Sequence, residues 1–204
     1  MSLTEVQLNE NKNRYLALIK SISSDKGDID RFIKWITERS DFFEAPASTK
    51  YHGSFVGGLC LHSLNVYDNL VKLVESQNLS YSSDTLKIVA LLHDLSKANL
   101  YERYIKNVKN DVTGEWEKVP EYKVRDSENR FIYGNHEQNS EYMARSFFDL
   151  TLEESTAILH HHAGKSWDSA QDDIGTLYNK YTLALLLHLA DMLATFYTEN
   201  IHVN

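Results

Sequence analysis

The stretch ALLHDLSKANLY, residues 90–101, places an imidazole, a carboxylate and an ammonium group directly after an apolar run. Residues 88–92 are all apolar, so His93 and Asp94 are predicted to enter the core with them. A buried charge is costly unless a partner compensates it. The stretch therefore predicts that compensating groups surround His93 and Asp94 in the folded protein.

The composition is typical of one globular domain. The chain has 204 residues, of which 42% are hydrophobic and 25% are charged, with two prolines and eight glycines. This length and balance predict a single domain over residues 1–204, with N-terminal helices in 1–43 and the main body in 44–199. No internal repeat or low-complexity tract is present.

Charge and apolar patterning predict a cytoplasmic protein, for which small anionic ligands stay open if a local site supplies cations. Cys60 is the only cysteine, and the start MSLTEVQLNENK lacks the features of a secretory signal. The longest apolar block, 181–190, is about half of the roughly 20 residues that a membrane span needs, so no membrane partner is expected. A net charge of −8 argues against stable binding of duplex nucleic acid, which depends on lysine and arginine. The oligomeric state is left open.

Apolar residues recur at helical spacing through most of the chain. The predicted helices cover 8–22, 29–37 with a cap at Asp28 or Asp30, 59–73, 86–97 with a start near Ser83 or Asp84, 136–148, 151–162 and 176–199. The exception is 104–125, where β-branched and aromatic residues flank a Thr-Gly turn signal. The predicted fold is therefore an all-α bundle with a small β-hairpin inserted at about 104–125. Pro120 restricts the second arm to an edge strand or a bulge.

Most of the nine histidines fall where helical phase directs them inward. His62 lies three residues after Leu59, on the predicted buried stripe of its helix. Lys97 lies four residues after His93 and three after Asp94, so these side chains are expected to share a face. Asp191 follows His188 by three residues inside an apolar helix.

Three consecutive histidines, 160–162, cannot all face one point of a helix. His161 and His162 continue the apolar side, whereas His160 is predicted to be solvated. His136 follows Gly134 at a predicted helix start, where a capping role alone would explain it. Each of these residues has an ordinary structural explanation, but together they favour one shared metal centre that supplies every buried partner.

Imidazoles and carboxylates without thiolates suit Mn, Fe, Co, Ni, Zn or Mg. Six or more candidate ligands exceed the four of a tetrahedral zinc site. The sequence therefore predicts two divalent metal ions that share a carboxylate. Two ions roughly 3.5 to 4 Å apart are the arrangement used for phosphoryl hydrolysis.

The ordered series of His62, His93-Asp94, His136, His161 or His162, and Asp191 resembles the HD-domain metal-dependent phosphohydrolases. The likeness covers about residues 44–199, the predicted HD core, and is strongest in APASTKYHGSFVGGLCLHSLNVY (45–67), LLHDLSK (91–97) and ILHHHAG (158–164). It is similar to the small helical members carried by bacteria and their phages, which also have a hairpin at this place.

The resemblance implies a ligand set for each ion. The first ion would be held by His62, His93, Asp94 and Asp191. The second would be held by Asp94 as a bridge with His136 and His161, and His162 is the alternate or additional ligand. Lys97 matches the lysine of the HDxxK variants, a phosphate contact or proton donor.

Two departures from the family pattern stand out. Asn135 takes the place of the glycine that many relatives have before the third histidine, at the position that leads into the second ligand set. The GYP motif of cyclic-di-GMP phosphodiesterases is absent after His162, so that substrate is not expected.

The resulting hypothesis is a metal-dependent phosphohydrolase that acts on nucleotide phosphate esters, as a phosphomonoesterase or a phosphodiesterase, through a metal-bridging hydroxide. Asp94 and Lys97 are the predicted catalytic residues. Lys97 and Arg103 are predicted to contact the phosphate of a nucleotide or short oligonucleotide. His52 either lines the pocket or is an exposed loop histidine.

The predicted hairpin and its flanks gather six cations, Arg103, Lys106, Lys109, Lys118, Lys123 and Arg125. They could guide an anionic substrate or cover the site, although a solvated charged hairpin is the favoured interpretation. Trp116 and Tyr122 are expected to pack on the helices rather than stack on bases. Two other functions stay open: a di-iron oxygenase of the HD superfamily, and a nucleotide-binding module without catalysis.

Overall fold

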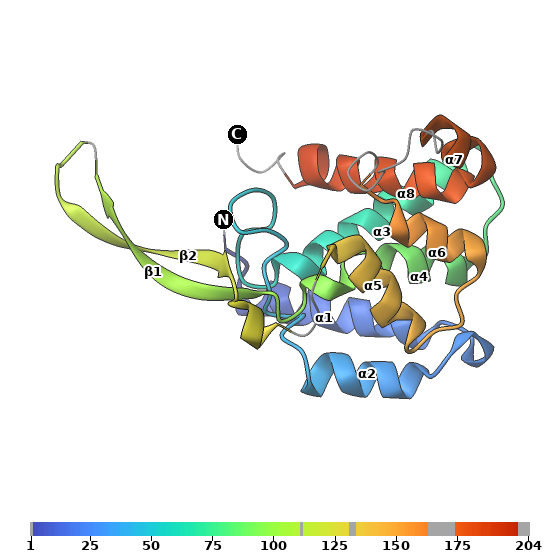
Figure 1. Cartoon of the computed structure of the whole chain (residues 1–204), viewed down its shortest axis with the longest axis horizontal. Coiled ribbons are helices and arrows are strands. Elements are labelled where there is room, and N and C mark those ends of the chain that lie inside the picture. Colours follow the sequence, from blue (N-terminus) through green and yellow to red (C-terminus); the bar gives the residue numbers. More distant parts are fainter. Residues whose placement is uncertain (1, 111, 131–133, 163–173, 200–204) are drawn as a thin grey trace.

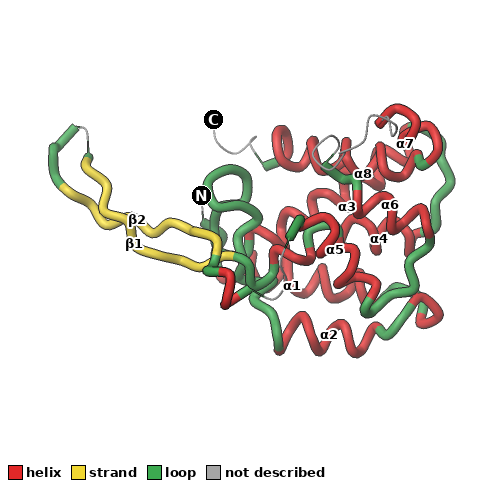
Figure 2. Tube along the Cα trace, viewed as in Figure 1, coloured by secondary structure: helices red, strands yellow, loops and turns green. Residues whose placement is uncertain are grey.

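Helices form the body of the protein, and one β-hairpin extends from it (Figure 1). The computed structural model describes residues 2–110, 112–130, 134–162 and 174–199. Its helices are α1 (Glu5–Lys20), α2 (Ile29–Glu38), α3 (Gly58–Ser76), α4 (Ser83–Leu92), α5 (His136–Arg145), α6 (Leu152–Leu159), α7 (Ile174–Lys180) and α8 (Thr182–Leu193). Its strands are β1 (Tyr101–Lys109) and β2 (Trp116–Val124). The predicted helical fold with an inserted hairpin is confirmed (Figure 2).

Side-chain caps define where several helices begin. Asp28 accepts a hydrogen bond from the backbone N–H of Arg31, as predicted for the start of α2. Ser82 caps α4 in the same way. Thr151 and Glu154 cap each other's backbone N–H groups at the start of α6. These bonds satisfy N–H groups that have no partner within the helix itself.

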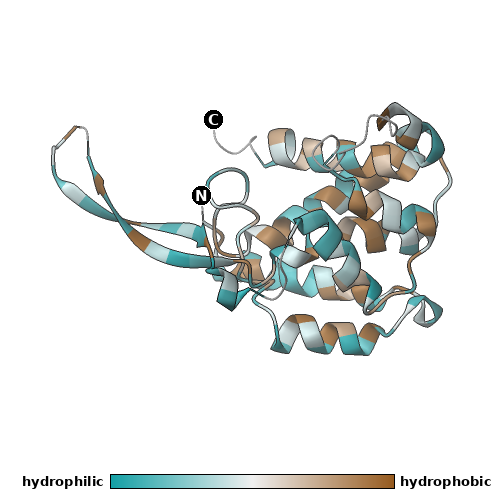
Figure 3. Cartoon of the chain, viewed as in Figure 1, coloured by the Kyte–Doolittle hydropathy of each residue, from teal (hydrophilic) through white to brown (hydrophobic). Residues whose placement is uncertain are grey.

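The helix α3 lies in the middle of the body, packed against α1, α4 and α8, while α6 packs on α4 and α8 (Figure 1). Hydrophobic residues concentrate in these helices, whereas the hairpin is mostly hydrophilic (Figure 3). The buried side chains form one apolar cluster that runs from Tyr15 in α1 to Ala194 beyond α8. Among the helices that the structure describes, none is both long and apolar enough to cross a membrane.

Several predicted helices end earlier than their apolar pattern. The helix predicted over 86–97 stops at Leu92, and a separate 3₁₀ turn follows at Leu95–Lys97. The helix predicted over 151–162 stops at Leu159. In both places the backbone carbonyl that the next turn would use contacts a histidine ring instead: Ala90 contacts His93, and Ile158 contacts His161. The ring nitrogen thus takes the place of the backbone N–H that would bond to this carbonyl if the helix continued.

The other boundary errors lie near the C-terminal end. The helix predicted over 136–148 ends at Arg145. The segment predicted as one helix over 176–199 is divided into α7, α8 and a π-helical turn at Ala194–Thr198. The break falls at Tyr181, whose φ of −126° and ψ of 78° lie outside the helical region.

The hairpin begins three residues earlier than predicted, at Tyr101. Arg125 fixes its base, because the guanidinium donates to the carbonyl of Tyr101 and pairs with Asp41 at 3.1 Å. The expectation that Trp116 packs on the helices is wrong: 70% of its surface is exposed, because the hairpin extends away from the body. Tyr122, nearer the base, is half-buried.

Tyr15 joins α1 to the end of α4, two residues before His93. The ring is fully buried, and its hydroxyl donates to the backbone carbonyl of Leu91 at 2.9 Å. Burial raises the pKa of this phenol well above its ordinary value, so the hydroxyl stays protonated as a donor.

The Tyr15→Phe substitution should lower the free energy of unfolding by about 1–3 kcal/mol, since it leaves the Leu91 carbonyl buried without its donor. Urea denaturation followed by circular dichroism measures the change. Tyr142→Phe is the matched control, because Tyr142 is 67% exposed and should tolerate the loss of its hydroxyl. Equal midpoints for the two variants would show that the buried hydrogen bond contributes no stability.

Candidate metal centre

The predicted metal-ligating residues come from five separate segments and meet in one place. They are His62 in α3, His93 and Asp94 after α4, His136 at the start of α5, His161 and His162 after α6, and Asp191 in α8. Most are buried: His62, His93 and His161 have no exposed surface, and Asp94 is only 1% exposed. The structure therefore brings all seven together although their positions span most of the chain.

The two oxygens of Asp94 face two different groups of imidazoles. Oδ2 lies 3.6 Å from His62 Nε2 and 3.4 Å from His93 Nε2. Oδ1 lies 3.6 Å from His161 Nε2 and 3.7 Å from His136 Nε2. These separations are long for hydrogen bonds. They fit ligands of a common ion, because two atoms that each lie about 2.1 Å from a metal are roughly 3 to 3.6 Å apart.

A first ligand set consists of His62, His93, Asp191 and Asp94 Oδ2. The Nε2 atoms of His62 and His93 are 3.4 Å apart, and Asp191 Oδ1 is 3.1 Å from His62 Nε2. The ligand atoms of His62, His93 and Asp191 all lie within 4.8 Å of one another. Two imidazoles and two carboxylates are a donor set for borderline or hard divalent ions.

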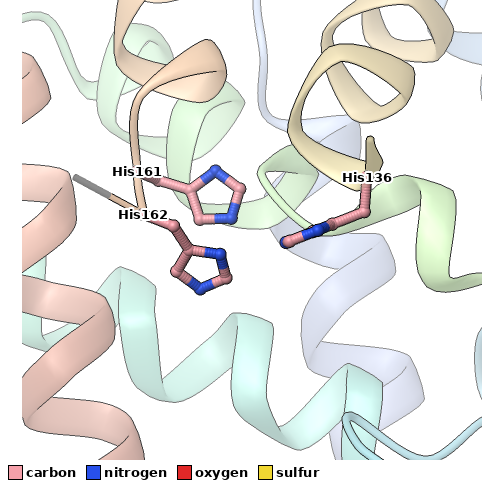
Figure 4. A group of neighbouring side chains, drawn as sticks. All are labelled: His136, His161 and His162. Atoms are coloured by element: carbon pink, nitrogen blue, oxygen red, sulfur yellow. The ribbon is translucent and has the colours of Figure 1, made fainter. Parts of the chain in front are cut away.

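A second ligand set consists of His136, His161 and Asp94 Oδ1. Figure 4 shows the rings of His136 and His161, with His162 beside them, turned toward a common space. Among the described residues, no hydrogen-bond partner reaches Asp94 Oδ1, His136 Nε2 or His161 Nε2, although all three atoms are buried. Buried polar atoms rarely lack partners. A cation between them would satisfy all three, so these residues fit a metal ion.

Outer contacts fix the tautomer of two of the buried histidines, His93 and His161. His93 Nδ1 lies 2.8 Å from the carbonyl of Ala90, and His161 Nδ1 lies 2.7 Å from the carbonyl of Ile158. A carbonyl oxygen only accepts hydrogen bonds, so each Nδ1 carries the proton. In the neutral ring each Nε2 then presents a lone pair toward Asp94, which is the arrangement that metal-binding histidines use.

The sequence profile of the HD domain matches residues 61–195, which is about two thirds of the chain. The chain belongs to the HD domain family. The predicted family is thereby confirmed, and HD domains are generally metal-dependent hydrolases. No solved structure matches the chain.

Asn135 replaces a glycine of many HD domains without distorting the backbone. Its φ of −72° is open to any residue, and its side chain caps α5 by accepting from the N–H of Glu137. The conformation that needs glycine lies one residue earlier, at Gly134, whose φ is 105°. The departure therefore leaves the position of His136 intact.

Two carboxylates that were not predicted from the sequence contact the Nδ1 atoms of candidate ligand histidines. Glu199, just after the π-helical turn, lies 2.8 Å from His62 Nδ1. Glu137 lies 3.3 Å from His136 Nδ1 and 3.2 Å from His162 Nδ1. Glu137 could have been noticed because it directly follows His136. Glu199 carries no local signal, because 137 residues separate it from His62.

His162 lies between two carboxylates. Its Nε2 is 3.1 Å from Asp191 Oδ2, and its Nδ1 faces Glu137. Burial alone would lower the pKa of His162, but these two partners raise it to about 9. His188, three residues before Asp191 in α8, contacts the backbone carbonyl of His161 at 2.7 Å. His188 thus orients the segment after α6 and lies outside both ligand sets.

Lys97 is buried and forms an ion pair with Asp94, with 2.6 Å between Nζ and Oδ2. Burial disfavours charge on both groups, yet the pKa of Asp94 is held well below its ordinary value by Lys97 and His93. The pKa of Lys97 is raised by Asp94 against the effect of burial. Both side chains therefore remain charged, which keeps Asp94 available as a shared ligand.

His52 lies at the edge of the centre, half-buried, with its ring 4.7 Å from the ring of His62. Burial is the main reason that its pKa is lowered to about 4, so it is neutral near pH 7. The loop that holds it folds back tightly: a Cβ on Gly58 would overlap the carbonyl oxygen of Gly53. Arg103 is farther out, on β1, where it helps to line a hollow beside Tyr122.

Removing Glu199 should weaken metal binding at the first ligand set. Glu199→Ala takes away the partner that orients His62, and loss of such an outer contact costs about 10- to 100-fold in affinity. Competition with a chromophoric chelator measures the dissociation constant. Glu75→Ala, an exposed residue of α3, is the control that should bind metal as the parent does. Unchanged affinity in Glu199→Ala would contradict the assignment.

Metal binding at neutral pH should release protons. Without metal, the pKa of His62 is raised to about 10, because Asp191 and Glu199 outweigh the opposing effect of burial, and that of His162 is raised to about 9. Both rings are therefore cationic at pH 7, and a ligand must lose its proton to bind. Affinity should rise as pH increases toward 9 to 10 and fall at lower pH.

Isothermal titration calorimetry with Mn²⁺ in buffers of different ionisation enthalpy measures this release. The apparent binding enthalpy should depend on the buffer. An enthalpy that is the same in every buffer would show that His62 and His162 are already neutral.

Proposed function

We propose that the protein hydrolyses phosphate esters of nucleotides, with one divalent ion held in each of the two ligand sets. The observation that carries the proposal is the position of Asp94, whose two oxygens face separate groups of imidazoles at 3.4 to 3.7 Å. A single-ion site would not need both oxygens directed in this way.

Divalent ions, when bound, supply a nucleophilic water at neutral pH and stabilise charge on phosphate oxygens. The side chains of the protein set the rest of the geometry. Asp94 links the two ligand sets, and the carbonyl and carboxylate partners hold the Nε2 atoms toward it. Such preorganised groups need no rearrangement during the reaction.

Lys97 is the cation of the protein that is best placed for a phosphate oxygen or a leaving group. Its Nζ lies 2.6 Å from Asp94, so it is adjacent to both ligand sets. Because the chain carries a net charge of −8, an anionic substrate depends on such local cations. His52 is neutral and lies beside His62, where it can contact the ester without repelling a metal ion.

The groups at the base of the hairpin suit a nucleotide better than a bare phosphate ester. Tyr101, Arg103 and Tyr122 line one hollow at the base of the hairpin. Aromatic rings stack on bases, and an arginine binds phosphate through its planar fork. These groups support a nucleoside monophosphate, a nucleoside triphosphate or a short oligonucleotide as substrate.

Activity should depend on Asp94 and Lys97 in different ways. Asp94→Ala should lose metal and hydrolysis together, because one carboxylate serves both ligand sets. Lys97→Ala should keep metal and lose about 10²- to 10³-fold in kcat, the usual cost of removing one electrostatic contact to the transition state. Metal content is measured by mass spectrometry. Rates are measured on nucleotides and bis(p-nitrophenyl) phosphate with Mn²⁺, Co²⁺, Ni²⁺ or Mg²⁺.

Lys87→Ala is the matched control, since Lys87 is also buried and also pairs with an aspartate three residues away, Asp84. Parent-level hydrolysis by Asp94→Ala would refute the mechanism. Consumption of O₂ without ester hydrolysis would instead identify an oxygenase, and nucleotide binding without turnover would identify a binding module.

A further inference from the structure

The two faces of the β1–β2 hairpin differ in charge. Side chains alternate between faces along each strand. The register places Arg103, Lys109 and Lys118 on one face together with Ile105, Trp116 and Tyr122, and none of the ten residues on that face is acidic. We call this the cationic face. It is a cationic and aromatic surface on a protein with net charge −8.

The opposite face neutralises its own cations. Lys123 pairs with Glu102 at 2.8 Å, and Lys106 pairs with Glu121 at 3.1 Å. In the described part of the chain, no carboxylate forms an ion pair with the three cations of the cationic face. Both faces carry lysine, yet only one face leaves its charges available for an anionic partner.

The cationic face also exposes large apolar side chains. Trp116 is 70% exposed and Ile105 is 58% exposed. A two-stranded hairpin is only marginally stable in water without something packed against it. Exposed apolar side chains that alternate with cations suit a partner that has both planar aromatic rings and negatively charged groups.

The inner end of this face adjoins the metal centre. Tyr101, the first residue of β1, is half-buried and close enough to Lys97 for the two groups to interact electrostatically. Lys97 is in turn bonded to Asp94. From Tyr101 to Lys109 the strand extends over about 26 Å at ~3.3 Å per residue. The face is therefore an elongated surface with one end at the candidate site.

We propose that the cationic face binds single-stranded nucleic acid and guides the strand toward the metal centre. The inference rests on the proposed hydrolase function and narrows its substrate to single-stranded DNA or RNA. Bases would stack on Trp116 and Tyr122, while Lys109, Lys118 and Arg103 neutralise phosphates. A narrow two-stranded arm offers such a row of contacts to a flexible strand more readily than to a rigid duplex.

The test measures binding of fluorescein-labelled oligothymidylate and oligouridylate, each about 12 nucleotides long, by fluorescence anisotropy. Trp116→Ala should weaken binding about fivefold or more, as expected for the loss of one stacked base. The double variant Lys109→Gln, Lys118→Gln should reduce the slope of log affinity against log salt by about 1.4, which is ~0.7 for each lost phosphate contact.

The matched control is the double variant Lys106→Gln, Lys123→Gln, which removes the same charge from the opposite face. It should bind both oligonucleotides as the parent does. Equal weakening by the two double variants would overturn the proposal, because binding would then depend on total charge. A dimer seen by light scattering and dissociated by Lys118→Glu, with no oligonucleotide binding, would assign the face to a second copy of this chain.

Hydrolysis of bis(p-nitrophenyl) phosphate by the unsubstituted protein separates this inference from the proposed function. Hydrolysis together with oligonucleotide binding that is insensitive to the cationic face refutes the guiding role alone. Absence of hydrolysis together with binding that depends on this face refutes the catalytic assignment alone.

Discussion

The structure depends on one buried carboxylate. Asp94 is almost fully enclosed, and an isolated charge in such a place would be strongly unfavourable. Lys97 and four imidazoles surround it, and against the effect of burial the ion pair with Lys97 keeps it ionised. Because these partners come from different helices, compensating a single charge requires α3, α5 and the ends of α4 and α6 to meet at one point.

Compensation of Asp94 also shapes the helices themselves. Both α4 and α6 stop where a histidine ring takes over a backbone carbonyl, so the ends of these helices and the orientation of the ligands have one cause. Glu137 and Glu199 contact the Nδ1 atoms of the other two imidazoles, His136 and His62. Each of these partners holds a ring nitrogen away from Asp94. The opposite nitrogen is thereby left facing the centre, so the ring is already oriented to bind a metal ion.

Charged side chains are arranged differently in the hairpin and in the helical body. In the body, buried charged groups such as Asp94 and Lys97 pair with each other, whereas the hairpin, as far as the structure describes it, carries paired charges on one face and unpaired cations on the other. On one face, Lys106 and Lys123 form ion pairs across the strands with glutamates. The cationic face combines cations that form no such pair in the described part of the chain with the exposed ring of Trp116. Arg125 ties this arm to Asp41 at its base, so the arm is anchored next to the site although most of it is solvated.

The sequence by itself determined the family and the helical class, and it named the candidate ligands that the fold brings together. The family followed from the resemblance of the ordered histidine and aspartate motifs. The helical class and the inward placement of the ligands followed from helical phase, which is a local property: residues three and four apart share a face. Only the tertiary structure decided where α4 and α6 end, that Glu199 meets His62, and that Trp116 is exposed. Those outcomes depend on competition between side chain and backbone for the same carbonyl, and on contacts across more than a hundred residues. Neither of these effects produces a periodic pattern of residues that could be recognised in the sequence.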